Sequence, residues 1–554
     1  MPEEGSQMEQ QQEQQELTVL IYFASDNPLA PLVVSELKAI KDAGFQKDTT
    51  VLCLYDPMEK DAPTQLLDVN FKRRKAKGTF IGDGADPYVR NMTEDEVPKA
   101  ELTHAMQVIV GDPSANVTAF ESLRSFIEFA LQKRPAQNYM LILLGHGMIV
   151  GNDTFLPDGD TDSAITLKKL KELCGMFTSD NKTSLRLLGL HSCSMSSIEV
   201  AYELKGKADY MLATQGTMFV NGWPYRQLLK KTFNQVKDAP VDYDELIGKL
   251  YYLCLYNFTD FMTAGYSCDI ALCRLHPENF ERLKKPLQDL VTVLKKGLTP
   301  GVSIVKDLIL LAHWDAQSFW SENYTDLWDF CACLAKRCND AKTGPEIIAL
   351  CKAVQDALAP ENKRGNPGGI VRYADNFGTE YQFARGLSIY FPWCKPLDDR
   401  RATVNSELDF NEATQRQASR KTILKNYEEY DFTSEFGDES SWFSFLRTYW
   451  DDTRRVPRNE PRDAFYNTIK RDLDLSEDAA EHVYKTAERT FNNGVLKRTP
   501  ELKKTPDVGT DCTCPTIKNY PTRRDSDRNV RQFSITPGAL GAFLPPKEGE
   551  NEEQ

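Results

Sequence analysis

A histidine and a cysteine each follow an apolar, strand-like segment, in an arrangement that suits nucleophilic catalysis. His146, flanked by Gly145 and Gly147, comes just after the apolar run 139–144, and Cys193 follows a second such run, 185–190. A cysteine nucleophile needs a partner that shares or accepts its proton, and imidazole titrates near neutral pH. The pair therefore indicates acyl transfer, with the backbone N–H groups of Gly147 and Cys193 as candidate donors to the oxyanion.

Each of these signals also has a purely structural interpretation. A histidine beside glycine can simply occupy a tight turn, and a lone cysteine often behaves as a small buried hydrophobe. The segment after Cys193 favours the functional interpretation, since Ser196 and Glu199 have the spacing of a helix capping box. A helix that began at once would place Cys193 at its positive end and favour the thiolate.

The surrounding sequence predicts the elements that must position these side chains. Continuous apolar runs, which suit strands buried on both faces of a parallel sheet, alternate with segments of helical spacing. We expect strands at 17–24, 50–55, 139–144, 185–190 and 208–213, and helices at 31–44, 120–131, 165–177 and 196–204. Successive strands of such a sheet are often neighbours, and ligands bind at their carboxyl ends. The prediction is an α/β fold in which His146 and Cys193 meet at one sheet edge.

The second half of the chain is more helical and ends in polar segments. We expect helices at 240–256, 277–296, 302–318, 323–338 and 343–358, and one further strand at 386–391. The predicted division is a disordered tail at 1–15, a main domain at 16–452, a helical extension at 453–500 and a disordered tail at 501–554.

The ordered set of motifs resembles the clostripain-like branch of the caspase-like cysteine peptidases, a group that includes caspases, legumains and gingipains. The resemblance covers residues 17–452 and rests on the His-Gly and Cys elements together with Met195, Ile198–Leu204, Ala208–Ala213, Asn221–Tyr225, Ala24–Asn27 and Gly386–Pro392. It implies a caspase-like, mostly parallel sheet flanked by helices, with helical additions and a C-terminal extension. It also implies a cysteine endopeptidase that forms a thioester acyl-enzyme and is activated by self-cleavage.

His191 departs from the pattern of this family, which usually has Asp two residues before the cysteine. That carboxylate contributes to a pocket for Arg or Lys, and an imidazole cannot pair with a guanidinium in the same way. We hypothesise that the first substrate pocket accepts something other than Arg and is lined by His191, Gln215, Gly216, Thr217 and Asn221. The alternative is that His191 supports the site from behind and leaves specificity to other groups.

The loop between His146 and Cys193 carries the alternating carboxylates Asp158, Asp160 and Asp162. Hard oxygen ligands of this kind suit Ca²⁺, and some clostripain-like enzymes use Ca²⁺, whereas the alternative is a solvated acidic loop. We therefore expect no obligatory cofactor. If the loop binds a metal, the expected metal is calcium.

The same region, residues 151–182, is a candidate activation loop, because the resemblance includes self-cleavage. Candidate cleavage sites, which hold only if the pocket keeps a basic specificity, are Lys168, Lys169, Lys171 and Lys182.

The overall composition limits the classes of partner. The net charge of −14 argues against nucleic acid and against anionic lipid. No secretory signal or long apolar span is recognised, and the 13 cysteines suit a reducing compartment, so we expect the cytoplasm. The expected partner is a protein or peptide substrate. The alternative from another class is an inactive caspase-like scaffold that binds a protein through its C-terminal region.

Overall fold

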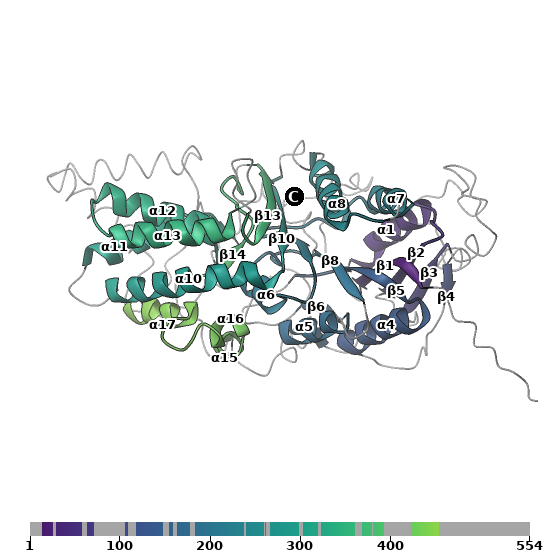
Figure 1. The fold of residues 1–554 in the computed structure, drawn as a ribbon, viewed down its shortest axis with the longest axis horizontal. Helices are drawn as coiled ribbons and strands as arrows, with labels where there is room; N and C mark the ends of the chain where they lie inside the picture. The colour runs from purple at the N-terminus through teal and green to yellow at the C-terminus, as the bar shows by residue number, and fades with distance from the viewer. Residues whose placement is uncertain are drawn as a thin grey trace, which may run out of the picture.

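The predicted apolar runs form the centre of one nine-stranded sheet in the computed structural model (Figure 1). The structure describes residues 14–453 except 26–28, 58–63, 71–105, 109–117, 148–154, 159–162, 178–182, 238–239, 260, 262–265, 299–302, 320–322, 360–367, 379 and 393–422. The predicted segments 1–15, 453–500 and 501–554 therefore lie, apart from Gln14, Gln15 and Thr453, outside the described residues.

Parallel strands make up the middle of the sheet. The order is β13-β10-β9-β8-β5-β1-β2-β3-β4, and the pairs from β9 to β2 are parallel. The bounds of the parallel strands are β1 Gln15–Ser25, β2 Thr49–Pro57, β5 Ala136–Leu144, β8 Ser184–His191 and β9 Tyr210–Ala213. All five were expected from their apolar runs, and the fold class is confirmed.

Antiparallel strands extend the sheet at both edges, which the sequence pattern did not predict. Their bounds are β3 Gln65–Val69, β4 Met106–Val108, β10 Cys268–Arg274 and β13 Val371–Phe377. Strand β13 is only partly buried, and β10 carries a buried Asp269 within an otherwise apolar run. These polar positions break the continuous apolar pattern by which the central strands were identified.

Helices cover both faces of the sheet and bury its two hydrophobic cores. One face is covered by α1 Ala30–Asp42, α7 Tyr225–Val236 and α8 Tyr243–Asn257, and the other by α4 Ala119–Lys133, α5 Leu167–Gly175 and α6 Ile198–Glu203 (Figure 1). The hairpin β6 Phe155–Asp158 and β7 Ser163–Ile165 lies on the α4 side, with Phe155 and Ile165 buried in the same core. Each face of the central strands is thus apolar, as a parallel sheet requires.

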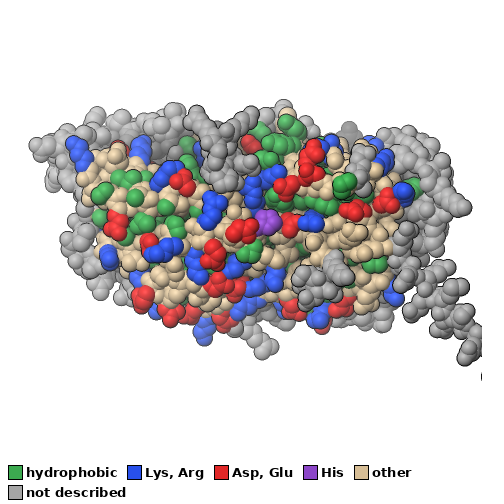
Figure 2. All heavy atoms as spheres, viewed as in Figure 1, with side chains coloured by type: hydrophobic (Ala, Val, Ile, Leu, Met, Phe, Trp, Pro, Cys, Tyr) green, Lys and Arg blue, Asp and Glu red, His purple; other side chains and the backbone are tan. Residues whose placement is uncertain are grey.

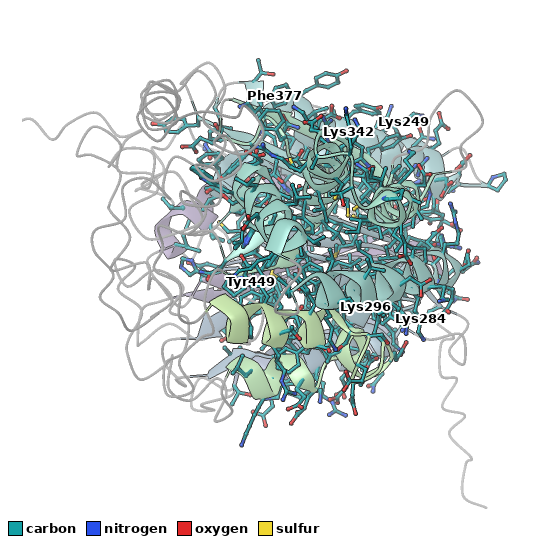
Figure 3. The ribbon with its side chains drawn as sticks, turned by 90° about the vertical axis from the view of Figure 1, so that its left-hand side faces the viewer. Lys249, Lys284, Lys296, Lys342, Phe377 and Tyr449 are labelled. Carbon is teal, nitrogen blue, oxygen red and sulfur yellow. The ribbon has the colours of Figure 1, made fainter. Side chains whose placement is uncertain are left out.

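A helical lobe extends the molecule beyond the β13 edge of the sheet (Figure 1). It contains α10 Pro277–Gly297, α11 Ser303–Asp315, α12 Leu327–Asp340, α13 Pro345–Leu358 and α17 Trp442–Thr453. Its small sheet has the order β11-β12-β14, with bounds Ser318–Phe319, Tyr324–Asp326 and Ser388–Tyr390. The strand expected at 386–391 therefore belongs to this second sheet. Figure 3 views the lobe end on, with α17 below the longer helices.

The cysteines of α12 pack inside the lobe. Cys331, Cys333 and Cys338 are all buried in its hydrophobic core, as expected for thiols on the inner face of a helix. Across the described ranges, no three His, Cys, Asp or Glu side chains are grouped as a metal site. No helix in the part of the chain that the structure describes is long and apolar enough to cross a membrane. Acidic and basic side chains are interspersed on the face shown in Figure 2.

Short helix α6 joins the sheet to the C-terminal segment through two buried carboxylates. Glu199 accepts hydrogen bonds from the Tyr390 amide at 2.8 Å and from the Tyr427 hydroxyl at 2.7 Å. Glu203 accepts one from the Phe432 amide at 3.2 Å. The helices involved are α15 Ile423–Glu428 and α16 Asp431–Ser434. Burial raises the pKa of both Glu199 and Glu203 to about 7, so α6 is anchored by acids that favour the protonated form.

This anchoring predicts a pH-dependent stability. Glu199 ionises near pH 4.5 in the unfolded chain but near 7 in the folded one, so the free energy of unfolding should fall as pH rises between these values. The slope from one such group is on the order of 1 kcal/mol per pH unit. Glu199→Gln keeps an oxygen for both donors and cannot ionise, so urea unfolding from pH 4.5 to 7 should show a shallower slope. An unchanged slope would contradict the assignment.

Candidate functional site

Strands β5 and β8 bring His146 and Cys193 to the same edge of the sheet. The two strands are parallel neighbours, and Leu144 pairs with His191 in their register. His146 and Cys193 each lie two residues further on, so their backbones leave the sheet at the same level. Both side chains are nearly covered, at 1% and 4% exposed. The two residues thus lie at the carboxyl ends of neighbouring strands, the edge at which the sequence predicted that they meet.

Gly147 fixes how closely the two loops approach each other. A Cβ built on Gly147 would lie 1.7 Å from the carbonyl oxygen of Cys193 and 3.0 Å from its amide nitrogen. No side chain fits in that space, so glycine is required by the close approach of two backbones. The backbone of Gly147 therefore lies against that of the candidate nucleophile, where its N–H was expected to help bind an oxyanion.

A strained turn, rather than a helix end, carries the cysteine. Ser194 has φ 62°, a left-handed conformation that is costly for a residue with a side chain. The helix begins only at Ile198, with Ser197 as its N-cap accepting from the Val200 amide. The expected capping box of Ser196 and Glu199 is wrong, because Glu199 bonds to Tyr390 and Tyr427. The predicted contact of the thiol with a helix terminus is also wrong.

The loop after β9 covers the thiol. The Met218 amide donates to Cys193 Sγ at 3.2 Å, and Sγ lies 3.6 Å from the Met218 carbonyl oxygen, within range of an S–H donor. The Ser194 amide donates to the Gly216 carbonyl at 3.0 Å. The segment 214–218 is therefore part of the immediate surroundings of the candidate nucleophile, and we call it the thiol loop.

The predicted pocket residues gather on this loop and its continuation, but they differ in exposure. The side chain of Gln215 is fully engaged, donating to Asp326 at 2.9 Å and accepting from the Gly386 amide at 2.8 Å. Gly216 is buried and Thr217 is half-buried. Asn221 is exposed in the short helix η3, Val220–Gly222. Only Thr217 and Asn221 of this set present accessible side chains.

His191 is held in the interior by three aromatic or backbone partners. Its Nε2 donates to the Phe219 carbonyl at 2.8 Å, so Nδ1 must accept from the Tyr225 hydroxyl at 2.8 Å. Its ring stacks on Trp223 at 4.8 Å between centroids. Burial lowers the pKa of His191 to about 3, so the imidazole stays neutral at physiological pH. This arrangement favours the alternative that His191 supports the site from behind.

Three groups that contact the thiol or its loop were not identified from the sequence. Met218 contacts the sulfur, Asp269 on β10 accepts from two amides of the thiol loop, and the Tyr381 hydroxyl contacts Thr217. A buried Asp inside an apolar run was a signal for Asp269. Tyr381 is far away in the sequence, and no local pattern marks it.

The calcium prediction falls largely outside the described residues. Asp160 and Asp162 are not described, and only the backbone of Asp158 is, in β6. Three of the candidate cleavage positions, Lys168, Lys169 and Lys171, lie within helix α5, a conformation that does not present an extended peptide to a protease. Lys182 lies outside the described residues.

Comparison with known proteins identifies the family. Residues 21–450 match the clostripain family. The chain belongs to this family. It is therefore a cysteine-type endopeptidase of the clostripain kind.

Solved structures of similar proteins are distant in sequence. One is an inactive protease zymogen from Parabacteroides distasonis, 17% identical, with a TM-score of 0.46 over 76% of this chain and 99% of that chain. Another is a secreted cysteine protease from Bacteroides thetaiotaomicron, 15% identical, with a TM-score of 0.45 over 76% of this chain and 99% of that one. No curated protein matches the sequence.

The close approach at Gly147 predicts a large effect of one methyl group. Gly147→Ala should lower kcat/KM at least about 100-fold, because a Cβ must displace the Cys193 carbonyl and with it the nucleophile. Gly175→Ala is the matched control, since its Cβ would come no closer than 3.8 Å to the Lys207 Nζ. Peptide hydrolysis by both variants checks this, and an active Gly147→Ala enzyme would contradict the geometry.

Proposed function

We propose that this clostripain-family peptidase hydrolyses peptide bonds through a dyad of His146 and Cys193. The proposal is supported chiefly by the shared register of β5 and β8, since both residues lie two positions beyond the Leu144–His191 pair. The contact between the Gly147 and Cys193 backbones gives further support. A histidine and a cysteine on facing loops are the minimum for thiol-based acyl transfer.

The reaction follows from these groups. The Cys193 sulfur attacks the scissile carbonyl while His146 holds the thiol proton. The Gly147 and Cys193 amides bind the oxyanion as the carbonyl carbon becomes tetrahedral. His146 then gives the proton to the leaving amine, the C–N bond breaks, and a thioester to Cys193 remains. Water, deprotonated by His146, hydrolyses the thioester and regenerates the thiol.

We infer a substrate pocket that does not select Arg through a carboxylate. The position that usually carries Asp in this family holds His191, whose ring is neutral and fully hydrogen-bonded. Thr217 and Asn221 remain as side chains that a substrate can reach. Neither carries charge, so we propose that the residue before the scissile bond is recognised by polar contacts and shape.

The dyad is tested with variants and a thiol-reactive probe. Cys193→Ala should abolish peptide hydrolysis and labelling by a peptidyl acyloxymethyl ketone. His146→Ala should lower both rates by about 10³-fold or more, because the base is lost. Cys174→Ala, which removes a buried thiol from the core on the other face of the sheet, is the control and should keep activity.

Full activity of Cys193→Ala would exclude this nucleophile.

Intact mass of the wild type and of Cys193→Ala after incubation also decides whether the chain cuts itself, which we propose as its mode of activation. Cleavage in the wild type alone supports self-processing, and an uncut wild type that is fully active contradicts it.

Specificity is tested with a peptide panel and with His191→Asp. We expect weak cleavage after Arg by the wild type, and no gain from His191→Asp. The new carboxylate would face the Phe219 carbonyl in the interior and should destabilise the fold by about 3 kcal/mol or more. Tyr225→Phe, which removes a single hydrogen-bond donor to His191, should cost about 1 kcal/mol. A strong preference for Arg in either enzyme would refute the pocket proposal.

We further propose that the enzyme needs no obligatory metal and works in a reducing compartment such as the cytoplasm. The described cysteines from Cys53 to Cys351 are buried and not joined in disulfides, and reduced thiols persist in the cytoplasm. Activity in the presence of EDTA and fractionation of cells that express the full chain test the two statements. Binding of a protein partner through residues 453–554 concerns a segment outside the described residues.

A further inference from the structure

The thiol loop is the part of the site on which the nucleophile depends most directly. Its Met218 amide donates to Cys193 Sγ at 3.2 Å, and its Gly216 carbonyl accepts from the Ser194 amide at 3.0 Å. A hydrogen bond donated to sulfur favours the thiolate over the thiol. Any group that fixes the position of this loop therefore also affects the reactivity of the thiol.

Asp269 holds the loop from the side of β10. Its carboxylate accepts the Gln215 amide at 2.7 Å and the Gly216 amide at 2.8 Å. The residue is 2% exposed, so these bonds replace the water that the carboxylate loses on burial. Two consecutive amides bound to one carboxylate leave the backbone at this point little freedom to rotate.

Tyr381, which follows β13 in the chain, holds Thr217, the next residue of the loop. Its hydroxyl accepts the Thr217 amide at 3.2 Å and lies 3.2 Å from Thr217 Oγ1. Its ring packs on Gly216, where an added Cβ would lie 2.5 Å from Tyr381 Cζ. Three successive amides, from Gln215 to Thr217, are thus bound by two side chains that come from outside the loop.

The side chain of Gln215 adds a third fixed point. It bridges the Asp326 carboxylate and the Gly386 amide, so the loop is tied to β12 and to the segment before β14. These contacts act on the side chain of Gln215 and not on the backbone that leads to Met218. The backbone contacts of Asp269 and Tyr381 lie nearer to the Met218 amide along the chain.

We propose that Asp269 and Tyr381 are positioning residues for catalysis, which hold the thiol loop so that its Met218 amide contacts the Cys193 sulfur. Neither residue touches the reacting atoms in this role. The proposal rests on Cys193 being the nucleophile, as argued above. It goes beyond the dyad because it assigns part of the thiol's reactivity to side chains on β10 and on the segment after β13.

The test is the rate of Cys193 alkylation by iodoacetamide, measured from pH 5 to 9 on full-length protein. Iodoacetamide is small and needs no substrate pocket, so the rate reports on the thiol itself. Asp269→Asn turns one acceptor oxygen into a donor that faces the loop amides, and should slow alkylation at pH 7 about tenfold. Tyr381→Phe removes only the hydroxyl and should slow it about threefold. In both variants the pH of half-maximal rate should rise.

Glu203→Gln is the matched control. Glu203 is likewise buried, accepts a backbone amide and has its pKa raised by burial to about 7, but it holds Phe432 rather than the thiol loop. It should lower thermal stability by an amount similar to Asp269→Asn and leave the alkylation profile unchanged. The double variant Asp269→Asn/Tyr381→Phe should show less than the product of the two single effects, since both act through one loop.

The outcomes separate this proposal from the proposed function. Single variants that alkylate within twofold of the wild type, or a Glu203→Gln variant that slows as much as Asp269→Asn, overturn the positioning role. If Asp269→Asn yields no folded protein, Tyr381→Phe decides alone, because loss of one hydroxyl from a half-buried ring should leave the fold intact. If peptide hydrolysis by the wild type depends on Cys193 but alkylation is unchanged in the variants, the dyad is supported and the positioning role of Asp269 and Tyr381 is refuted.

Discussion

The register between β5 and β8 is the constraint on which the rest of the site depends. Pairing of Leu144 with His191 makes both strands end at one level, and Gly147 then lies directly against the Cys193 backbone. A slip by one residue would turn every side chain of the strand to the opposite face and bury the wrong set. Both faces of these strands pack in apolar cores. The hydrophobic pattern that determines the strand register therefore also determines the relative positions of His146 and Cys193.

Buried polar groups beneath the site give the loops a single arrangement. Asp269 and Asp326 are almost fully buried, and burial raises the pKa of each to about 7. Their oxygens are satisfied by amides of Gln215, Gly216 and Arg385. Since an unpaired buried carboxylate is costly, other arrangements of these loops are disfavoured more strongly than apolar packing alone would achieve.

Features that depend on a local sequence pattern were predicted, whereas contacts made by residues from distant segments were not. The central strands and the shared edge of His146 and Cys193 follow from apolar runs, whereas the close approach of the Gly147 and Cys193 backbones was not predicted. The start of α6 at Ile198 was missed because Ser197, not Ser196, caps it, while Glu199 is drawn to Tyr390 and Tyr427. The interior position of His191 could not be predicted either, because Phe219 and Tyr225 reach it from another loop.

The left-handed turn at Ser194, next to Cys193, depends on contacts with residues that come much later in the chain. Such a conformation costs on the order of 1 kcal/mol and needs support from elsewhere. Here the Ser196 amide donates to the Thr214 carbonyl at 2.8 Å, and the Ser196 hydroxyl donates to the Gly386 carbonyl, 190 residues away in the chain. A nascent chain that ends before residue 386 has its cysteine but lacks part of this support. The loop that carries Cys193 can therefore reach its full set of contacts only after residue 386 has been synthesised.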